Sequence, residues 1–100
     1  MIKHIIVLKL KDQAEGRSKA DNAVLLKREL ASLTLTIKEI RKLEVGINLN
    51  TGEDAYDIGL VSEFANKSDL DVFQNNPEHQ RVAGLVRRVR ESRIVVDYEM

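Results

Sequence analysis

The chain contains two histidines, and both stand where an imidazole ring could take part in chemistry. His4 lies in the strand-like run 2–10, among isoleucine and valine side chains. His79 follows Asn76-Pro77-Glu78, a pattern typical of a helix start. Near neutral pH an imidazole can accept a proton or donate a hydrogen bond. We therefore take His4 and His79 as the candidate catalytic residues.

Composition excludes several classes of function. Sixteen basic residues balance sixteen acidic ones and aromatic residues make up 4% of the chain, so nucleic-acid binding is not expected. Cysteine is absent, which excludes disulfides and thiolate metal sites and fits a cytoplasmic protein. No run approaches the roughly 20 apolar residues of a membrane helix. No histidine spacing or glycine-rich loop predicts a metal or a cofactor.

Residues 2–10 form the clearest predicted strand, and the centre of this strand is apolar on both sides. Ile2, His4 and Ile6 share one side because successive strand side chains alternate, whereas Ile5 and Val7 share the other. A strand of this kind must be covered on both sides.

The other predicted elements follow in an order that defines a fold. Residues 11–17 are read as a loop, helices are expected at 18–33, 67–75 and 77–90, and strands at 36–49, 56–64 and 94–98. This is the order of an α+β ferredoxin-like β-α-β-β-α-β fold. It predicts one domain over residues 1–100, with a four-stranded antiparallel sheet and the helices on one face.

Helices on one face leave the other face of the sheet bare. Ile5, Val7 and Val95 are expected on that bare face, opposite His4. An exposed apolar patch of this kind marks an interface, so we expect a homodimer in which two sheets pack together. The alternative is a monomer whose long lysine side chains cover the patch.

Two further groups of residues have an expected role near the C-terminus. Tyr98 shares its parity with Ile94 and Val96, and is expected to reach inward from the last strand toward a pocket. Arginines crowd the last helix and its exit. These arginines are Arg81, Arg87, Arg88, Arg90 and Arg93. A structural role is sufficient to explain them, because positive charge complements the C-terminal end of a helix dipole. The alternative is a site that binds a carboxylate or a phosphate.

Five segments together resemble the stress-responsive dimeric α/β-barrel (Dabb) family. They are residues 1–11, Leu43–Gly46, Ser62–Phe64, Asn76–His79 and Val96–Tyr98. The resemblance implies a ferredoxin-like fold that dimerises through its sheets into a barrel. It also implies a pocket between sheet and helices. In one branch of the family, the cofactor-independent polyketide cyclases, that pocket closes a ring by aldol condensation.

The resemblance also implies which residues line the pocket. His4 and His79 match the two pocket histidines of the cyclase branch. Phe73 falls where that branch has a tyrosine and lacks its hydroxyl, and Ile58 falls where it has a further histidine. Phe73, Ile58 and Tyr98 are therefore expected to line the pocket. Because no third polar group completes a relay, the residues favour pocket lining over catalysis.

The sequence thus predicts a stress-related homodimer with a small-molecule pocket and no cofactor. The alternatives are a cofactor-independent lyase or polyketide-cyclase-like enzyme, a cofactor-free monooxygenase of the same dimeric barrel class, and a binding or structural dimer without turnover. A cavity that joins the two imidazoles favours an enzyme. A filled core between His4 and Phe73 favours a dimer without turnover.

Overall fold

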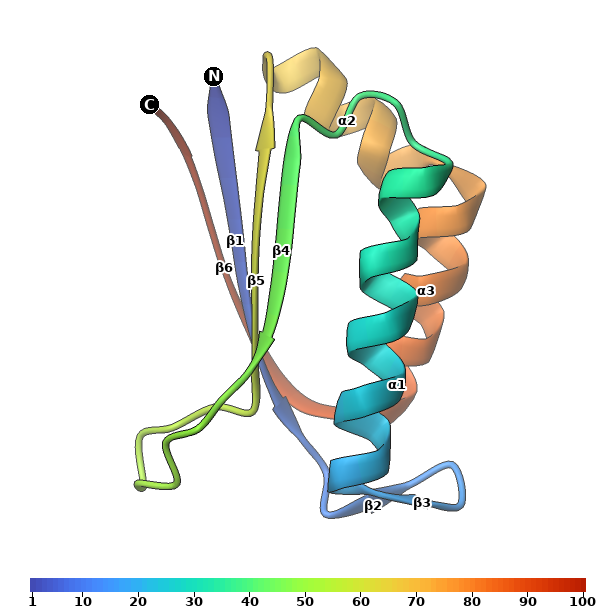
Figure 1. Ribbon diagram of the computed structural model, residues 1–100, viewed down its shortest axis with the longest axis vertical. Helices are drawn as coiled ribbons and strands as arrows, with labels where there is room; N and C mark the ends of the chain where they lie inside the picture. Colours follow the sequence, from blue (N-terminus) through green and yellow to red (C-terminus); the bar gives the residue numbers. More distant parts are fainter.

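The computed structural model describes residues 1–100 and is built on a four-stranded antiparallel sheet (Figure 1). The strands are β1 (Ile2–Leu10), β4 (Lys42–Ile47), β5 (Ile58–Phe64) and β6 (Arg90–Glu99). Their order is β4-β5-β1-β6, so the first strand is central and pairs with both β5 and β6. The predicted ferredoxin-like α+β fold is confirmed.

All the helices cover one face of this sheet (Figure 1). They are α1 (Lys19–Ser32), the short 3-10 helix η1 (Leu33–Leu35), α2 (Lys67–Asn75) and α3 (Pro77–Val89). Each α-helix begins at a side chain that accepts a hydrogen bond from a free backbone N–H, which stabilises the first turn. These capping residues are Ser18, Asn66 and Asn76. None of the helices combines the length and apolar character needed to span a bilayer.

The core lies between the sheet and the helices and contains sixteen buried apolar side chains. As the strand parity predicted, Ile2 and Leu8 point from β1 into this core, together with the polar His4. Ile5 and Val7 are half-buried on the opposite face. The central strand is therefore apolar on both sides, but helices cover only one of them.

The last strand differs from the prediction in its start and in its register. β6 begins before residue 94, and its pairing with β1 is irregular near the end of β1. Val95 pairs with Ile6 and therefore faces the helices, whereas Tyr98 pairs with Lys3 and faces away from them. The expected faces of Val95 and Tyr98 were wrong, because a shift of one residue moves every side chain to the other face.

The predicted strand over 36–49 is shorter in the structure. β4 covers Lys42–Ile47 alone, and residues 36–41 form a turn that follows η1. Ile37 is only 1% exposed, and its backbone N–H donates to the Leu33 carbonyl at 3.0 Å. Ile37 thus enters the core from a turn. An apolar residue at this position extended the alternating pattern that predicted a strand.

A small hairpin replaces the loop expected at 11–17. Strands β2 (Gln13–Ala14) and β3 (Arg17–Ser18) pair across Glu15 and Gly16, whose φ values are 54° and 73°. Two successive residues with positive φ form the tight turn that suits a two-residue hairpin. The buried Asn22 of α1 attaches this hairpin, since its amide donates to the Ala14 carbonyl at 3.1 Å.

Opposite stability effects are expected at two glycines. Gly16→Ala should lower the free energy of unfolding by about 1–2 kcal/mol, because a Cβ is strained at positive φ. Gly84→Ala should raise it by about 0.5–1 kcal/mol, because alanine is the better helix former and its Cβ meets only ordinary contacts. Urea unfolding of both variants checks the pair; equal shifts for the two would contradict the assigned turn.

The connection between β4 and β5 forms an arm, residues 48–57, that projects away from the helices (Figure 1). Asp57 fixes its base to β1: the Asp57 carboxylate accepts from the Leu10 N–H at 2.7 Å, and its own N–H donates to the Leu8 carbonyl at 2.8 Å. Leu49 within the arm is 97% exposed. The arm therefore presents an apolar side chain on the side of the sheet that lacks helices.

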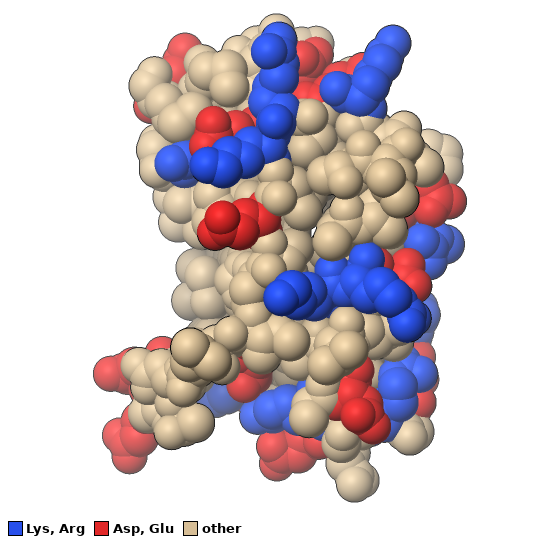
Figure 2. All heavy atoms as spheres, in the orientation of Figure 1, with Lys and Arg blue, Asp and Glu red and all other residues tan.

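Charged side chains of both signs are interspersed over the face seen in Figure 2. Many of the basic ones have carboxylate partners. Arg81 contacts Glu29 at 3.0 Å, and Arg88 contacts Glu15 at 2.5 Å. Pairing of this kind keeps charges of opposite sign close together on the surface.

Candidate functional site

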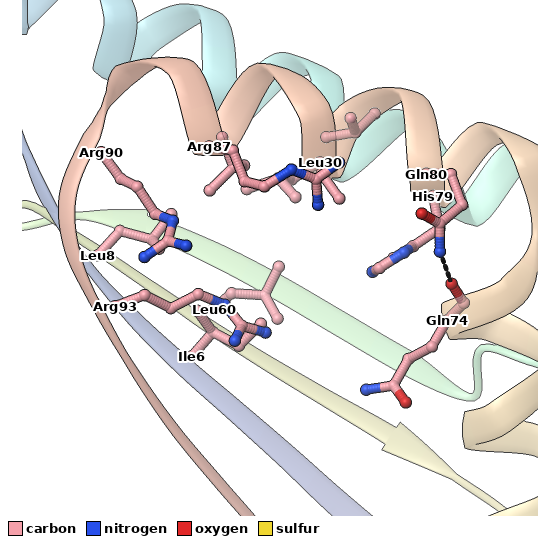
Figure 3. A pocket seen from close by; sticks show the side chains of 13 residues that line it. Ile6, Leu8, Leu30, Leu60, Gln74, His79, Gln80, Arg87, Arg90 and Arg93 are labelled. Atoms are coloured by element: carbon pink, nitrogen blue, oxygen red, sulfur yellow. Dashed lines mark hydrogen bonds between the residues drawn. The ribbon is translucent and has the colours of Figure 1, made fainter.

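A cavity of about 250 Å³ lies between the sheet and helix α3 (Figure 3). Apolar side chains from β1, β5, α1 and α3 form much of its wall: Ile6, Leu8, Leu30, Leu60, Val82, Ala83 and Val86. The remaining lining residues are polar and come from α2, α3 and β6: Gln74, His79, Gln80, Arg87, Arg90 and Arg93. An apolar concavity with a few converging polar groups is the usual form of a small-molecule site.

His79 is the sequence-predicted residue that lines this cavity. It lies in the first turn of α3, which Asn76 caps and Pro77 begins. Its Nδ1 atom is buried and has no hydrogen-bond partner. Next to it, the Gln80 side chain donates to the Gln74 carbonyl at 2.5 Å, which joins α3 to α2 at the edge of the cavity (Figure 3).

The surroundings of His79 favour its neutral form. Burial is the main cause that lowers the pKa of His79, and His4 adds to the effect. The positive charges of Arg93 and Arg87 lower this pKa further, while the Gln74 carbonyl acts in the opposite direction without making a regular hydrogen bond to Nδ1. An unprotonated imidazole at neutral pH can accept a proton or bind a donor.

Acid is expected to destabilise the protein through His79. Because the pKa of His79 is lower in the folded state, the unfolded state binds the proton more readily. This stabilisation is complete above the unfolded value of 6.5 and is lost as pH falls from there through the folded pKa. Urea unfolding should therefore show a steeper loss between about pH 7 and 5 in the wild type than in His79→Gln. Parallel pH profiles would contradict this.

His4 is fully buried and does not line the cavity. Its Nδ1 is in hydrogen-bond contact with an Asp97 carboxylate oxygen, and the two residues are paired across β1 and β6. Its Nε2 is buried without a partner. No group of three or more His, Cys, Asp or Glu side chains could hold a metal ion here. This contact with Asp97 holds the His4 ring in place. The sequence did not identify Asp97 as a site residue.

Phe73 fills the space between the two histidines. Its ring centroid lies 4.5 Å from that of His79, 4.9 Å from that of Phe64 and 6.2 Å from that of His4. Phe73 is 2% exposed and belongs to the core. No cavity joins the imidazoles, and the core between His4 and Phe73 is filled, which favours a dimer without turnover.

The other two predicted lining residues lie elsewhere. Ile58 is 1% exposed in the core, and it borders a shallow hollow beside the arm rather than the cavity. Tyr98 is 44% exposed on the side of the sheet without helices. The structure therefore brings neither residue to His79.

Three arginines line the cavity, and the sequence did not predict that they would: Arg87, Arg90 and Arg93. Helix α3 ends at Val89, with Arg90 as its C-cap, so Arg90 and Arg93 lie in β6 and Arg93 is beyond the reach of the helix dipole. Arg87 is in the last turn of α3 and lines the same cavity. The close spacing of these three arginines in the sequence was the signal that could have indicated a shared site. The position of the helix end decides which of them belong to α3 and which to β6.

Solved structures with the same fold include proteins of unknown function and enzymes. A protein from Bacteroides fragilis, described as dimeric, of unknown function and with a ferredoxin-like fold, is 37% identical. Its TM-score is 0.88, and the match covers 99% of this chain and 95% of that chain. None of the curated proteins matches this chain.

Two more distant neighbours share the fold. A hydroxynitrile lyase from Passiflora edulis is 18% identical with a TM-score of 0.84, over 99% of this chain and 92% of that chain. An antibiotic biosynthesis monooxygenase is also 18% identical, with a TM-score of 0.79, over 100% of this chain and 98% of that chain. The model of the Stress responsive A/B Barrel Domain family matches residues 2–100. This chain therefore belongs to the stress-responsive A/B barrel (Dabb) family.

Proposed function

We propose that this protein is a homodimer that binds a small molecule in the cavity between the sheet and α3. The single observation that carries the binding function is the cavity itself, with its apolar wall and with His79 at its edge. Its volume of about 250 Å³ is slightly below the usual range for drug-sized ligands, which points to a compact ligand.

The dimer is supported by the face of the sheet that no helix covers, here called the outer face. Its apolar residues come from three adjacent strands. Ile94, Val96 and Tyr98 are 48%, 50% and 44% exposed. An apolar patch at the centre of a sheet is costly in water and is relieved by a self-complementary contact. The outer-face residues are Ile5, Val7, Val61, Ile94, Val96 and Tyr98.

The arm and a relative add to this support. The arm projects on the same side as the outer face, and beside it lies a shallow hollow that Val7, Ile47 and Leu49 help to line. A second copy seated on the outer face would cover these side chains as well. The Bacteroides fragilis protein of the same fold is described as dimeric.

A neutral probe tests the binding function. Titration of the protein with 1-octanol, followed by two-dimensional NMR, should shift the resonances of cavity residues such as Leu60 and Val86. Ala83→Trp should weaken this binding at least about tenfold, since Ala83 lines the cavity and the indole would occupy it.

The matched control is Ala31→Trp, which places the same side chain at an exposed position of α1. It should leave octanol binding unchanged. Shifts that do not cluster at the cavity, or that persist in Ala83→Trp, would overturn the proposed binding site.

A cofactor-independent lyase-like reaction is a second candidate function, and it is favoured by one observation. His79 is a largely neutral imidazole at the cavity, with a buried Nδ1 that has no partner. Such a group can take a proton from carbon next to a carbonyl, leaving an enolate and an imidazolium, and can then return the proton. His4 is excluded from direct contact with the ligand by Phe73.

Deuterium exchange tests this second function. In D₂O the protein should accelerate exchange at the carbon between the carbonyls of 2,4-octanedione, and His79→Gln should lose most of that acceleration, at least about a hundredfold. Lys38→Gln, which introduces the same side chain at an exposed residue outside the cavity, should retain the full acceleration. Equal rates in wild type and His79→Gln would reject His79 as the base.

A further inference from the structure

Three guanidinium groups at the cavity have no carboxylate partner. Arg87, Arg90 and Arg93 line it, and none of them forms an ion pair. The neighbouring Arg88 shows the contrast, because it turns away from the cavity and contacts Glu15 at 2.5 Å. Figure 3 shows the three side chains extending from α3 and β6 into the same space.

The arrangement leaves buried hydrogen-bonding capacity unused. The Nε atom of Arg90 is buried and has no partner. A buried N–H without an acceptor destabilises the fold, and the cost is larger for a charged guanidinium than for a neutral donor. A free cavity therefore carries an unfavourable contribution that an acceptor inside it would remove.

The like charges also act on each other. Partial burial and the nearby charge of Arg90 lower the pKa of Arg93, with Asp97 opposing the shift. Asp97 is itself in contact with His4. No acidic residue lines the cavity. Its potential is therefore positive, and His79 adds no negative charge to it.

Apolar side chains lie beside the arginines in the cavity wall (Figure 3). Ile6, Leu8 and Leu60 come from the sheet, and Leu30, Val82 and Val86 face them from the helices. A ligand that matches both the arginines and the apolar part of the wall has a compact anionic end and an apolar body. At about 30 Å³ for each water-sized group, about 250 Å³ accommodates roughly eight such groups.

We propose that the cavity selects an organic carboxylate of about eight carbon atoms in all, with an apolar body. Arg90 and Arg93 bind the carboxylate, since a guanidinium matches the planar geometry of a carboxylate with two parallel N–H donors. Arg87 contributes positive charge from α3. The selectivity rests on the proposed binding function, and it deepens that function by naming the ligand class.

Octanoate and 1-octanol form the test pair, because they share the same chain and differ in the charged end. Isothermal titration or NMR should show octanoate binding at least about tenfold more tightly than octanol. Arg90→Gln and Arg93→Gln should each reduce that ratio about tenfold and leave octanol binding nearly unchanged. Arg41→Gln, which removes the same charge at an exposed residue outside the cavity, should keep the ratio.

Stability distinguishes a binding role from a structural one. Arg93→Gln should unfold at the same urea concentration as the wild type or a higher one, because it relieves repulsion with Arg90. A less stable variant that keeps the octanoate preference would assign Arg93 to the fold and overturn the proposal.

The remaining outcomes separate the two proposals. If octanol binds in the cavity and octanoate binds no more tightly, the carboxylate selectivity is wrong while the binding function stands. If neither compound binds, both proposals fail.

Discussion

Replacement of Val7 by lysine is expected to convert the proposed dimer into a monomer at micromolar protein concentration. Val7 lies at the centre of the outer face and pairs with Ile94 on one side and Gly59 on the other. In a two-fold contact each dimer would bury two lysines without partners. An uncompensated buried charge destabilises by about 3–5 kcal/mol, so the dissociation constant should rise at least about a hundredfold.

Sedimentation equilibrium measures this effect directly. Val24→Lys is the matched control, since it makes the same change at a residue of α1 that is 61% exposed. That variant should remain a dimer. A wild-type protein that is already monomeric, or a dimeric Val7→Lys variant, would remove the outer face as the interface.

Replacement of Phe73 by alanine is expected to destabilise the fold by about 3–5 kcal/mol. The Phe73 ring contacts three aromatic rings, those of His4, Phe64 and His79, and is 2% exposed. Its removal leaves a cavity between the histidines that the neighbouring side chains cannot fill. Since domains of this size are stable by about 5–15 kcal/mol, much of the stability would be lost.

Urea unfolding at a fixed protein concentration tests the Phe73 prediction, because the proposed dimer makes apparent stability depend on concentration. Val72→Ala, a truncation at the adjacent residue that is 46% exposed, should change the free energy of unfolding by about 0.5 kcal/mol or less. Similar losses in the two variants would contradict the central packing of Phe73.

The fold was predictable because its signals are local. The alternation of residues 2–10 indicated a strand apolar on both sides, and Asn76-Pro77 indicated a helix start, which the structure has at Pro77. The helix expected at 67–75 is α2. Signals that depend on packing were misread: Ile37 enters the core from a turn, and the φ values at Glu15 and Gly16 create a hairpin within a polar stretch.

The candidate site was only partly predictable, because it depends on register and on side chains that meet from distant segments. The sequence by itself determined the order of elements, the apolar central strand and His79 as a polar group at the start of α3. Only the tertiary structure decided that Phe73 separates the two histidines and that Asp97 reaches His4. It also decided that arginines from two elements enter one cavity, since the pairing of β6 with β1, and not local pattern, sets which side chains face the helices.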